Sequence, residues 1–391
     1  MSRAWSFNWD CHAPIVRMRA IAVGTASLLV LAACGGDGEG DGDGAASDGE
    51  PVEIRLASPF PETNAIGRHL AWWLEEIGGE LDGMVEFDYH PGGALLSLTD
   101  SLQGVVDGRV DASYIVESFS IGQLPFWGAT ALPFQTDNVE AALRAQADLY
   151  ENDERFSGMF RDYGLEVLFF APINATIWAL DFPIQSLSEM DGIRLRSAGR
   201  VAEAEAALGA DAVFMDVAEV YESLDRNVVD GSSTFPLDNA VTFGLHEVRS
   251  YFVNPGIGIF TSAAVVMDLD TYESLPDEAR RIIEEARSGE AVTMASEIQG
   301  LSETEGCDAF LDSGGTVVEI PADEVADWRA SVFDDLVDTW KGQVNEAGYE
   351  PTEGREVDED LDDWLATWQE TVAGYEEDAT YVAGLALCLG R

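Results

Sequence analysis

Residues 52–89, VEIRLASPFPETNAIGRHLAWWLEEIGGELDGMVEFDY, carry the pattern that decides the fold class. Val52–Ala57 alternates apolar and polar side chains, which predicts a strand. Asn64 can cap a helix over 65–81, where apolar side chains recur at helical spacing. Residues 85–89 alternate again and predict a second strand. Strand, helix and strand in succession predict an α/β fold with a parallel sheet.

The same alternation continues along the chain without an internal repeat. A chain of 391 residues is expected to form two domains. Residues 276–311 predict one helical run of roughly 50 Å, longer than a small domain is wide, with Ser288-Gly289 as a place for a kink. Further strands are predicted at 112–116, 166–171, 175–181, 192–197, 231–235, 249–254 and 257–267.

The charge of the chain is strongly one-sided. There are 73 Asp and Glu against 21 Lys and Arg, a formal net charge of -52. Nucleic-acid binding through the body of the protein is therefore not expected, because phosphates would meet a negative field. Lys341 is the one lysine. An acidic, lysine-poor surface suits a salty exterior, and a GC-rich genome explains the arginine bias equally well.

The N-terminus has the features of an export signal. Arg17 and Arg19 precede the apolar run 21–33, which is too short to cross a membrane, so 1–33 is predicted to be a signal peptide, with Met18 as an alternative start. The run ends in Leu-Ala-Ala-Cys at Cys34 and resembles the lipobox of bacterial lipoproteins. That resemblance implies cleavage before Cys34, lipidation of its thiol, and anchoring to the outer face of the cytoplasmic membrane.

The alternative for this segment is an ordinary cleaved signal with a chance cysteine. The Gly- and Asp-rich residues 34–51 have no apolar content to bury and are predicted to be a disordered tether. With Cys34 lipidated, Cys307 and Cys388 remain, and an exported protein favours a disulfide between them over two buried thiols. Neither the cysteines nor the four histidines have metal-ligand spacing, so no metal or cofactor is predicted.

Three segments in order resemble the solute receptors of TRAP transporters, the DctP family, here in a lipoprotein form. The first is YHPGGAL at 89–95, followed by LQGVVDGRVD at 102–111. The second is MDGIRLR at 190–196, and the third is EVYESLDRNVVDG at 219–231. The similarity covers about residues 53–345. No single motif is decisive, but three in register are specific.

The resemblance implies a two-lobed, periplasmic-binding-protein-like α/β fold with a cleft between the lobes, crossing strands and a long lobe-spanning helix. Lobe I is expected from 52–172 plus about 262–311, and lobe II from 173–261 plus about 312–391. Such a protein is not an enzyme. It is expected to be a monomer that captures a small organic acid and delivers it to a small and a large membrane subunit.

The resemblance places a ligand carboxylate on Arg196. A guanidinium offers a planar pair of donors that fits a carboxylate, whereas Arg194 is expected to pair with one of the many acids. Thr176 stands where sialic-acid receptors of the family carry a second arginine, which favours a smaller or more apolar mono- or dicarboxylate. Asn64 has a helix cap as its alternative role. The remaining ligand candidates are Trp178, Thr234, Phe235, Tyr114 and Glu117.

Two rival functions remain at this point. A receptor of the same fold could feed a sensor system instead of a transporter, and nothing in the sequence separates the two. A secreted lipoprotein hydrolase would need a G-x-S-x-G, an H-E-x-x-H or a cysteine–histidine arrangement. His246-Glu247 lacks the second histidine, since position 250 is Ser250, and the other patterns do not occur.

Overall fold

A computed structural model describes residues 50–377 and 384–390. The chain divides into two units, Met1–Asp48 and Gly49–Arg391, and the described residues all belong to the second. The predicted signal peptide, the lipidation at Cys34 and the tether up to residue 49 lie outside the described residues. None of the helices within the described ranges is long and apolar enough to span a bilayer.

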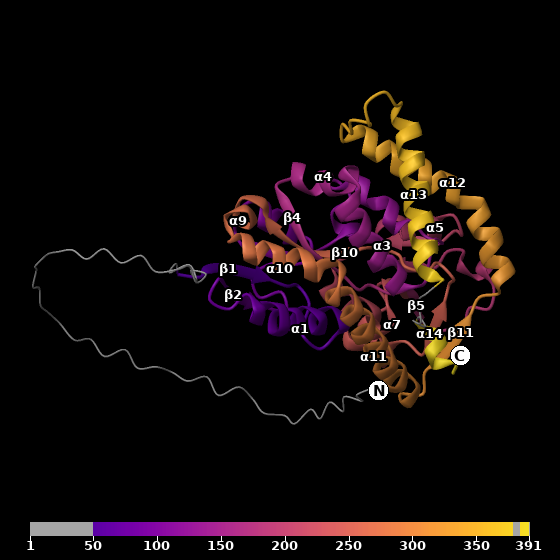
Figure 1. The fold of residues 1–391 in the computed structure, drawn as a ribbon. Helices are drawn as coiled ribbons and strands as arrows, with labels where there is room; N and C mark the ends of the chain where they lie inside the picture. The colour runs from indigo at the N-terminus through magenta and orange to yellow at the C-terminus, as the bar shows by residue number, and fades with distance from the viewer. Residues whose placement is uncertain (1–49, 378–383, 391) are drawn as a thin grey trace, which may run out of the picture. The chain divides into compact units, whose positions relative to one another are not determined.

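The first sheet has five strands in the order β2-β1-β3-β10-β4 (Figure 1). The β1–β2 and β1–β3 pairs are parallel, whereas β10 runs antiparallel to both β3 and β4. Strands β3 and β4 are buried along their whole length, as expected for strands covered on both faces. The strands are β1 (Val52–Ala57), β2 (Val85–His90), β3 (Ala112–Val116), β4 (Leu165–Ala171) and β10 (Ala263–Asp268).

Helices connect and cover these strands. The predicted first helix is α1, and the Asn64 side chain caps it by accepting a hydrogen bond from Gly67 N at 2.9 Å. Two 3₁₀ segments, η1 (Glu117–Phe119) and η2 (Pro125–Ala131), follow β3. The helices of this half are α1 (Ala65–Glu80), α2 (Ser101–Val106), α3 (Val139–Asn152), α4 (Glu154–Asp162), α9 (Leu269–Ser274) and α10 (Asp277–Ser288).

The second sheet has six strands in the order β11-β9-β5-β8-β6-β7. Here β5 runs antiparallel to its neighbours β8 and β9, so each sheet contains one strand opposed to both of its partners. The strands are β5 (Ile177–Leu180), β6 (Arg194–Arg196), β7 (Asp211–Val213), β8 (Gly231–Phe235), β9 (Tyr251–Asn254) and β11 (Thr316–Glu319).

Side chains from both faces of the second sheet are buried. Because side chains alternate along a strand, Trp178 and Leu180 join the larger hydrophobic core, whereas Ile177 and Ala179 join a second cluster on the opposite face. Short elements cover the sheet: η3 (Leu187–Met190), α5 (Gly199–Ala206), η4 (Val217–Glu219), α6 (Val220–Asp225), α7 (Leu237–Thr242) and α8 (Leu245–Val248).

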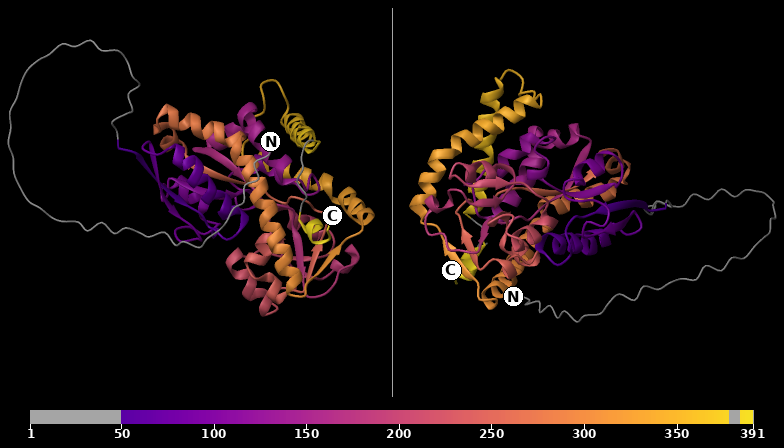
Figure 2. Two further views of the ribbon diagram at one scale, coloured as in Figure 1. Left: turned by 60° about the horizontal axis from the view of Figure 1, so that its bottom comes forward. Right: turned by 180° about the vertical axis from the view of Figure 1, so that it is seen from behind.

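The predicted long helix is two helices, α10 and α11 (Glu290–Asp312), which meet at an angle (Figures 1 and 2). The break falls at Gly289, whose φ of -101° and ψ of -107° are not helical. The sequence predicted a kink at this place, and the backbone is interrupted there. Helix α11 contacts α1 and α3 of the first half and α7 of the second, so it connects the two halves.

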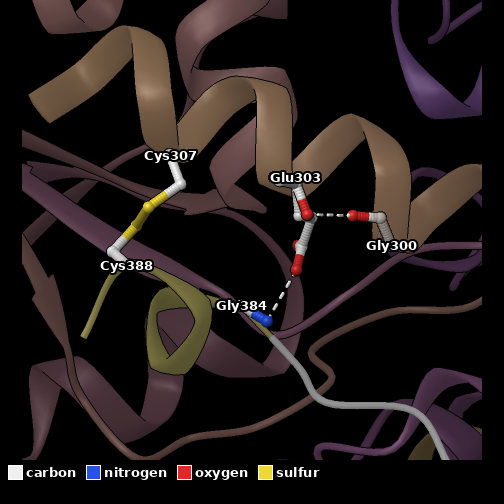
Figure 3. Close-up of a disulfide and its surroundings, with 6 residues drawn as sticks. Gly300, Glu303, Cys307, Gly384 and Cys388 are labelled. Carbon is white, nitrogen blue, oxygen red and sulfur yellow. Dashed lines mark hydrogen bonds between the residues drawn. A yellow bond between two sulfur atoms is a disulfide. The ribbon is translucent and has the colours of Figure 1, made fainter. Parts of the chain in front are cut away.

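Three helices complete the chain: α12 (Ala322–Glu346), α13 (Val357–Glu376) and α14 (Leu385–Cys388). Helix α13 packs along α3, and α12 packs against η2 and α5 (Figure 1). The C-terminal helices thus touch elements of both halves, and the proposed division into lobes stays a prediction. Cys307 of α11 and Cys388 of α14 form a disulfide with a Cα–Cα distance of 5.3 Å (Figure 3).

Candidate ligand-binding site

A small cavity of about 40 Å³ lies where loops after the strands of both sheets converge. Its polar lining consists of Ser118, Arg196, Thr234, Asn239 and Thr261. The rest is apolar: Phe60, Ile66, Leu98, Val116, Phe119, Ile173, Ala198, Val217, Phe235, Pro236 and Phe260. An apolar pocket with a few polar groups is the usual form of a small-molecule site.

A larger hollow of about 1000 Å³ lies between α4 and the connection from α12 to α13. Its charged side chains already pair with each other, since Arg155 binds Asp153 at 2.6 Å and Arg355 binds Asp363 at 2.8 Å. The smaller cavity contains a buried cation that is not paired in this way. It is therefore the better candidate for an anionic ligand.

Arg196 is that cation, and its side chain is 1% exposed. Its Nη1 donates to Thr234 Oγ1 at 2.6 Å and Ser233 O at 3.3 Å, and its Nη2 donates to Met215 O at 3.2 Å. The guanidinium lies 5.0 Å from the centre of the Phe235 ring. Burial lowers the pKa of Arg196 to about 10, so the group stays charged at neutral pH.

The bonds of Arg196 leave part of its donor capacity free. The partners are hydroxyl and carbonyl oxygens, and the Nε–H has no partner among the residues that the structure describes. A guanidinium has five donors, so Nε and one N–H of Nη2 remain for a carboxylate. Two such donors match what a carboxylate requires, and the role of Arg196 as their carrier stays a prediction.

Thr234 is held in an unusual backbone conformation. Its φ is 58°, which a β-branched residue rarely adopts. Its N–H donates to Thr176 Oγ1 at 2.9 Å, while its own hydroxyl donates to Ser233 O and accepts from Arg196. Strained residues are common at ligand sites, and here the strained backbone conformation orients the Thr234 hydroxyl towards the guanidinium of Arg196.

Arg194 behaves as the sequence analysis expected. It lies two residues before Arg196 on β6, yet its side chain is 44% exposed and binds Asp230 at 2.6 Å. Asp230 precedes β8, which lies beside β6 in the sheet. The outer arginine is thereby neutralised by an acid, and the inner one is left for another partner.

Two buried carboxyl groups interact with residues that line the cavity, Glu117 with Thr261 and Glu205 with Arg196. Glu117 is 1% exposed, and burial raises its pKa to about 7 although Arg200 and Thr261 oppose the shift. Arg200, also buried, donates to Gln343 Oε1 at 2.8 Å. A Cβ on Gly128 would lie 2.4 Å from Arg200 Nη2 and 3.0 Å from Glu117 Oε1, so a larger residue there would displace these side chains.

Glu205 is the second of these groups and has no exposed surface. It accepts a hydrogen bond from Trp178 Nε1 at 2.6 Å. Burial raises its pKa to about 7, and the Ser197, Ser233 and Trp178 side chains and the Arg196 charge lower it in part. Glu205 therefore interacts electrostatically with Arg196 but is only partly ionised at neutral pH.

The structure brings together some of the predicted residues. Arg196, Thr234 and Phe235 line the cavity, and Thr176 supports Thr234 from behind. Trp178 is not among the lining residues, because it binds Glu205 and packs on Trp328. Sequence reasoning missed Asn239 and Glu205, and the one available signal for Asn239 was its place just after the strand 231–235.

Asn64, Tyr114 and Glu117 are buried but are not among the residues that line the cavity. Tyr114 packs edge-on against the lining residue Phe60, with ring centres 5.2 Å apart. Burial and the charge of Asp238 raise the pKa of Tyr114 far above its usual value. Tyr114 Oη and Asn64 Nδ2 have no hydrogen-bond partner in the described part of the chain.

Comparison with known proteins identifies the family of this architecture. Residues 56–342 match the family described as "Bacterial extracellular solute-binding protein, family 7", DctP. The C4-dicarboxylate-binding periplasmic protein DctP of Rhodobacter capsulatus is 25% identical over 285 residues, 72% of this chain and 84% of the relative. The ectoine-binding periplasmic protein TeaA of Halomonas elongata is 29% identical over 153 residues, 39% of this chain and 44% of that relative's length.

A solved structure shares the fold. The TRAP solute-binding protein of Rhodoferax ferrireducens, in complex with copurified benzoate, superposes with a TM-score of 0.72 at 20% identity, covering 84% of this chain and 100% of that one. The family and its structural neighbours are solute-binding proteins of transport systems and not enzymes, which sets the hydrolase alternative aside. Because the family match spans most of the described fold, this chain belongs to the bacterial extracellular solute-binding proteins of family 7.

Proposed function

We propose that the protein is the extracytoplasmic receptor of a TRAP transporter and captures a small organic acid through a salt bridge to Arg196. The observation that carries this proposal is a buried arginine with free donors that lines a mostly apolar cavity. Asp216 and Glu205 stabilise the charge of Arg196 through space, but the hydrogen bonds of its guanidinium go to hydroxyl and carbonyl oxygens. A ligand carboxylate would give this buried charge an anionic partner at hydrogen-bond distance. The acid is then delivered to the small and large membrane subunits.

The apolar lining supports a carboxylate on an apolar body. Benzoate, found in the similar structure from Rhodoferax ferrireducens, combines one carboxylate with a ring. Phe60, Phe119 and Phe260 offer this chain aromatic walls for such a body. The same proposal includes the Cys34 lipid anchor at the outer face of the cytoplasmic membrane and a monomeric receptor.

The test is a binding screen of mono- and dicarboxylic acids on the exported domain, followed by substitution of Arg196. We expect Arg196→Ala to weaken binding of the best acid about 30- to 4000-fold, since truncating one partner of a buried charged pair costs about 2–5 kcal/mol. Arg196→Lys should restore binding only in part, because an ammonium lacks the planar fork.

Arg194→Ala is the matched control, since it removes an arginine from the same strand at an exposed, already paired position. It should bind the acid like the wild-type protein. Circular dichroism and the melting temperature report whether each variant is folded. Unchanged affinity in a folded Arg196→Ala protein would refute the site.

A further inference from the structure

The cavity has a second unsatisfied polar group besides Arg196. Asn239, in the first turn of α7, lines the cavity and is 5% exposed. Its Oδ1 accepts no hydrogen bond from any residue within 50–377 or 384–390. A buried acceptor left without a donor is unfavourable, so a partner from outside the protein is expected at this atom.

Neighbouring groups hold Asn239 in place but do not satisfy it. The preceding Asp238 accepts from Ala65 N of α1 at 3.1 Å and from Gln299 Nε2 of α11 at 3.2 Å. A Cβ on Gly306 would lie 3.2 Å from Asp238 Cα, which shows how closely α11 approaches this turn. The start of α7 is thereby fixed by two other helices, and the Asn239 amide is presented from a rigid support.

Water can occupy this position while the cavity is empty, since 40 Å³ is enough for a few molecules. A ligand that fills the cavity displaces that water. A ligand with its own donor replaces the hydrogen bond of the water to Oδ1, whereas a ligand without one leaves this buried acceptor unsatisfied. Asn239 therefore favours ligands that carry a donor.

The lining also limits the charge of the ligand. Arg196 is the one ionisable side chain among the residues that form the cavity wall in the described structure. A second carboxylate would therefore meet the rings of Phe60, Phe119 and Phe260 without a cation to pair with. This favours a monocarboxylate over a dicarboxylate.

We infer that Asn239 is a specificity-determining residue and that the ligand is an apolar monocarboxylate carrying one O–H or N–H donor away from its carboxylate. The inference rests on the proposed function, because it assumes that Arg196 binds the carboxylate. The Asn239 Oδ1 atom then accepts the hydrogen bond of the distal donor, while the aromatic walls enclose the apolar body.

The test uses pairs of acids that differ by a hydroxyl and a methyl group of similar size. The probes are the three hydroxybenzoates with the three methylbenzoates, and 3-hydroxybutyrate with 3-methylbutyrate, measured by calorimetry. For at least one pair the wild-type protein should bind the hydroxyl member about 5- to 150-fold more tightly. Asn239→Leu, which keeps a similar volume, should abolish or reverse that preference and leave the methyl member bound as well or better.

The outcomes separate this inference from the proposed function. Loss of all carboxylate binding in Arg196→Ala together with an equal hydroxyl-to-methyl ratio in wild type and Asn239→Leu would overturn the role of Asn239 alone. Tighter binding of succinate than of every monocarboxylate would overturn the ligand class. If wild type binds no carboxylate, the proposed function fails and takes this inference with it. A melting temperature near that of wild type shows that Asn239→Leu is folded.

Discussion

The buried polar groups around Asp360 have hydrogen-bond partners within the protein, whereas several of those around the Arg196 cavity do not. Asp360 of α13 is fully buried and accepts hydrogen bonds from Thr352, Tyr349, Arg155 and Arg355. Burial by itself raises its pKa, but these donors outweigh burial and hold the pKa at about 2. At the cavity, Glu117 is equally shielded from solvent but lies deeper among protein atoms and has fewer donors, and its pKa rises to about 7.

The difference is one of partners and not of residue type. The C-terminal cluster supplies its own donors, whereas the cavity leaves Arg196 Nε, Asn239 Oδ1 and Glu117 Oε1 without partners in the described chain. A region that satisfies its own polar groups contributes to stability. A region with unpaired buried polar groups contributes less to stability, but these groups can form hydrogen bonds with a ligand. The predictions below test this distinction, beginning with the largest effect.

Asp360→Ala should lower the free energy of unfolding by about 3–5 kcal/mol, because the donors of Tyr349 and Thr352 lose their acceptor and two arginines lose one of their carboxylates. Since folding lowers the pKa of Asp360 from 3.8 to about 2, its contribution is present above pH 3.8 and is lost as the pH falls towards 2. Urea unfolding of both proteins from pH 5 to pH 2 measures the loss and its disappearance in acid.

Asp363→Ala is the control for this cluster. It removes an exposed carboxylate that contacts the same two arginines, and it should change stability little. A loss equal to that of Asp360→Ala would show that charge, and not the buried network, stabilises the region.

The disulfide also stabilises the C-terminal part of the chain, in this case through a covalent bond. Its cysteines are 81 residues apart, and Gly384 N near α14 also donates to Glu303 Oε2 of α11 at 2.6 Å (Figure 3). Cys307→Ser with Cys388→Ser should lower the free energy of unfolding by about 2–4 kcal/mol, mainly by freeing the unfolded chain. Ligand affinity should not change, and a reductant should have no further effect on the variant. A reductant that leaves wild-type stability intact would contradict the prediction.

Glu117 should give the opposite pH dependence to Asp360. Folding raises its pKa from 4.5 to about 7, so the folded protein holds a proton that the unfolded chain releases. Stability should therefore fall as the pH rises from 4.5 to 7, by up to roughly 3 kcal/mol from this group. Glu117→Gln should remove that decrease, as seen in melting curves recorded from pH 4.5 to pH 8. Glu117→Asp keeps a titrating group and should retain part of it, whereas identical profiles for wild type and Glu117→Gln would argue against a protonated Glu117.

Substitutions of Asn64 should have the smallest effect on stability, and they distinguish its role as a helix cap from a role in ligand binding. Asn64→Ala removes the cap of α1 and should cost about 1 kcal/mol of stability. Asn64→Ser keeps a neutral capping oxygen and should preserve most of that stability. If Asn64→Ser binds the acid like wild type, the residue is a cap alone; if its affinity falls while the melting temperature holds, the Asn64 amide also contacts the ligand.

The sequence pattern was sufficient for much of the fold. Alternation at 52–57 and 85–89 and the cap at Asn64 correspond to β1, β2 and α1 because each depends on neighbours in the chain. The run 276–311 was predicted as one helix with a kink, but the backbone breaks at Gly289, since helical periodicity continues across a glycine that tertiary contacts can open.

The candidate site was predictable where a local motif carried it. Arg196, Thr234 and Phe235 lie at the ends of β6 and β8 and meet at the cavity. Trp178 could not be assigned from sequence, because the side on which its ring is buried depends on Glu205 and Trp328, far away in the chain. Asn239 was missed for the same reason, since a polar residue in a short helix is typical of a surface until two other helices cover it.

The sequence by itself determined the acidic charge, the elements with strong local patterns, and two arginines on one strand, whereas β7 and β11 of the second sheet were not predicted. It could not distinguish these arginines beyond a motif. The tertiary structure did so by placing Asp230 beside Arg194 and burying Arg196 against Phe235. Local patterns specify which elements form, because they depend on neighbouring residues. The charge and the free donors of a buried side chain depend on which distant groups surround it, and only the packing of the two sheets and of α11 decides that.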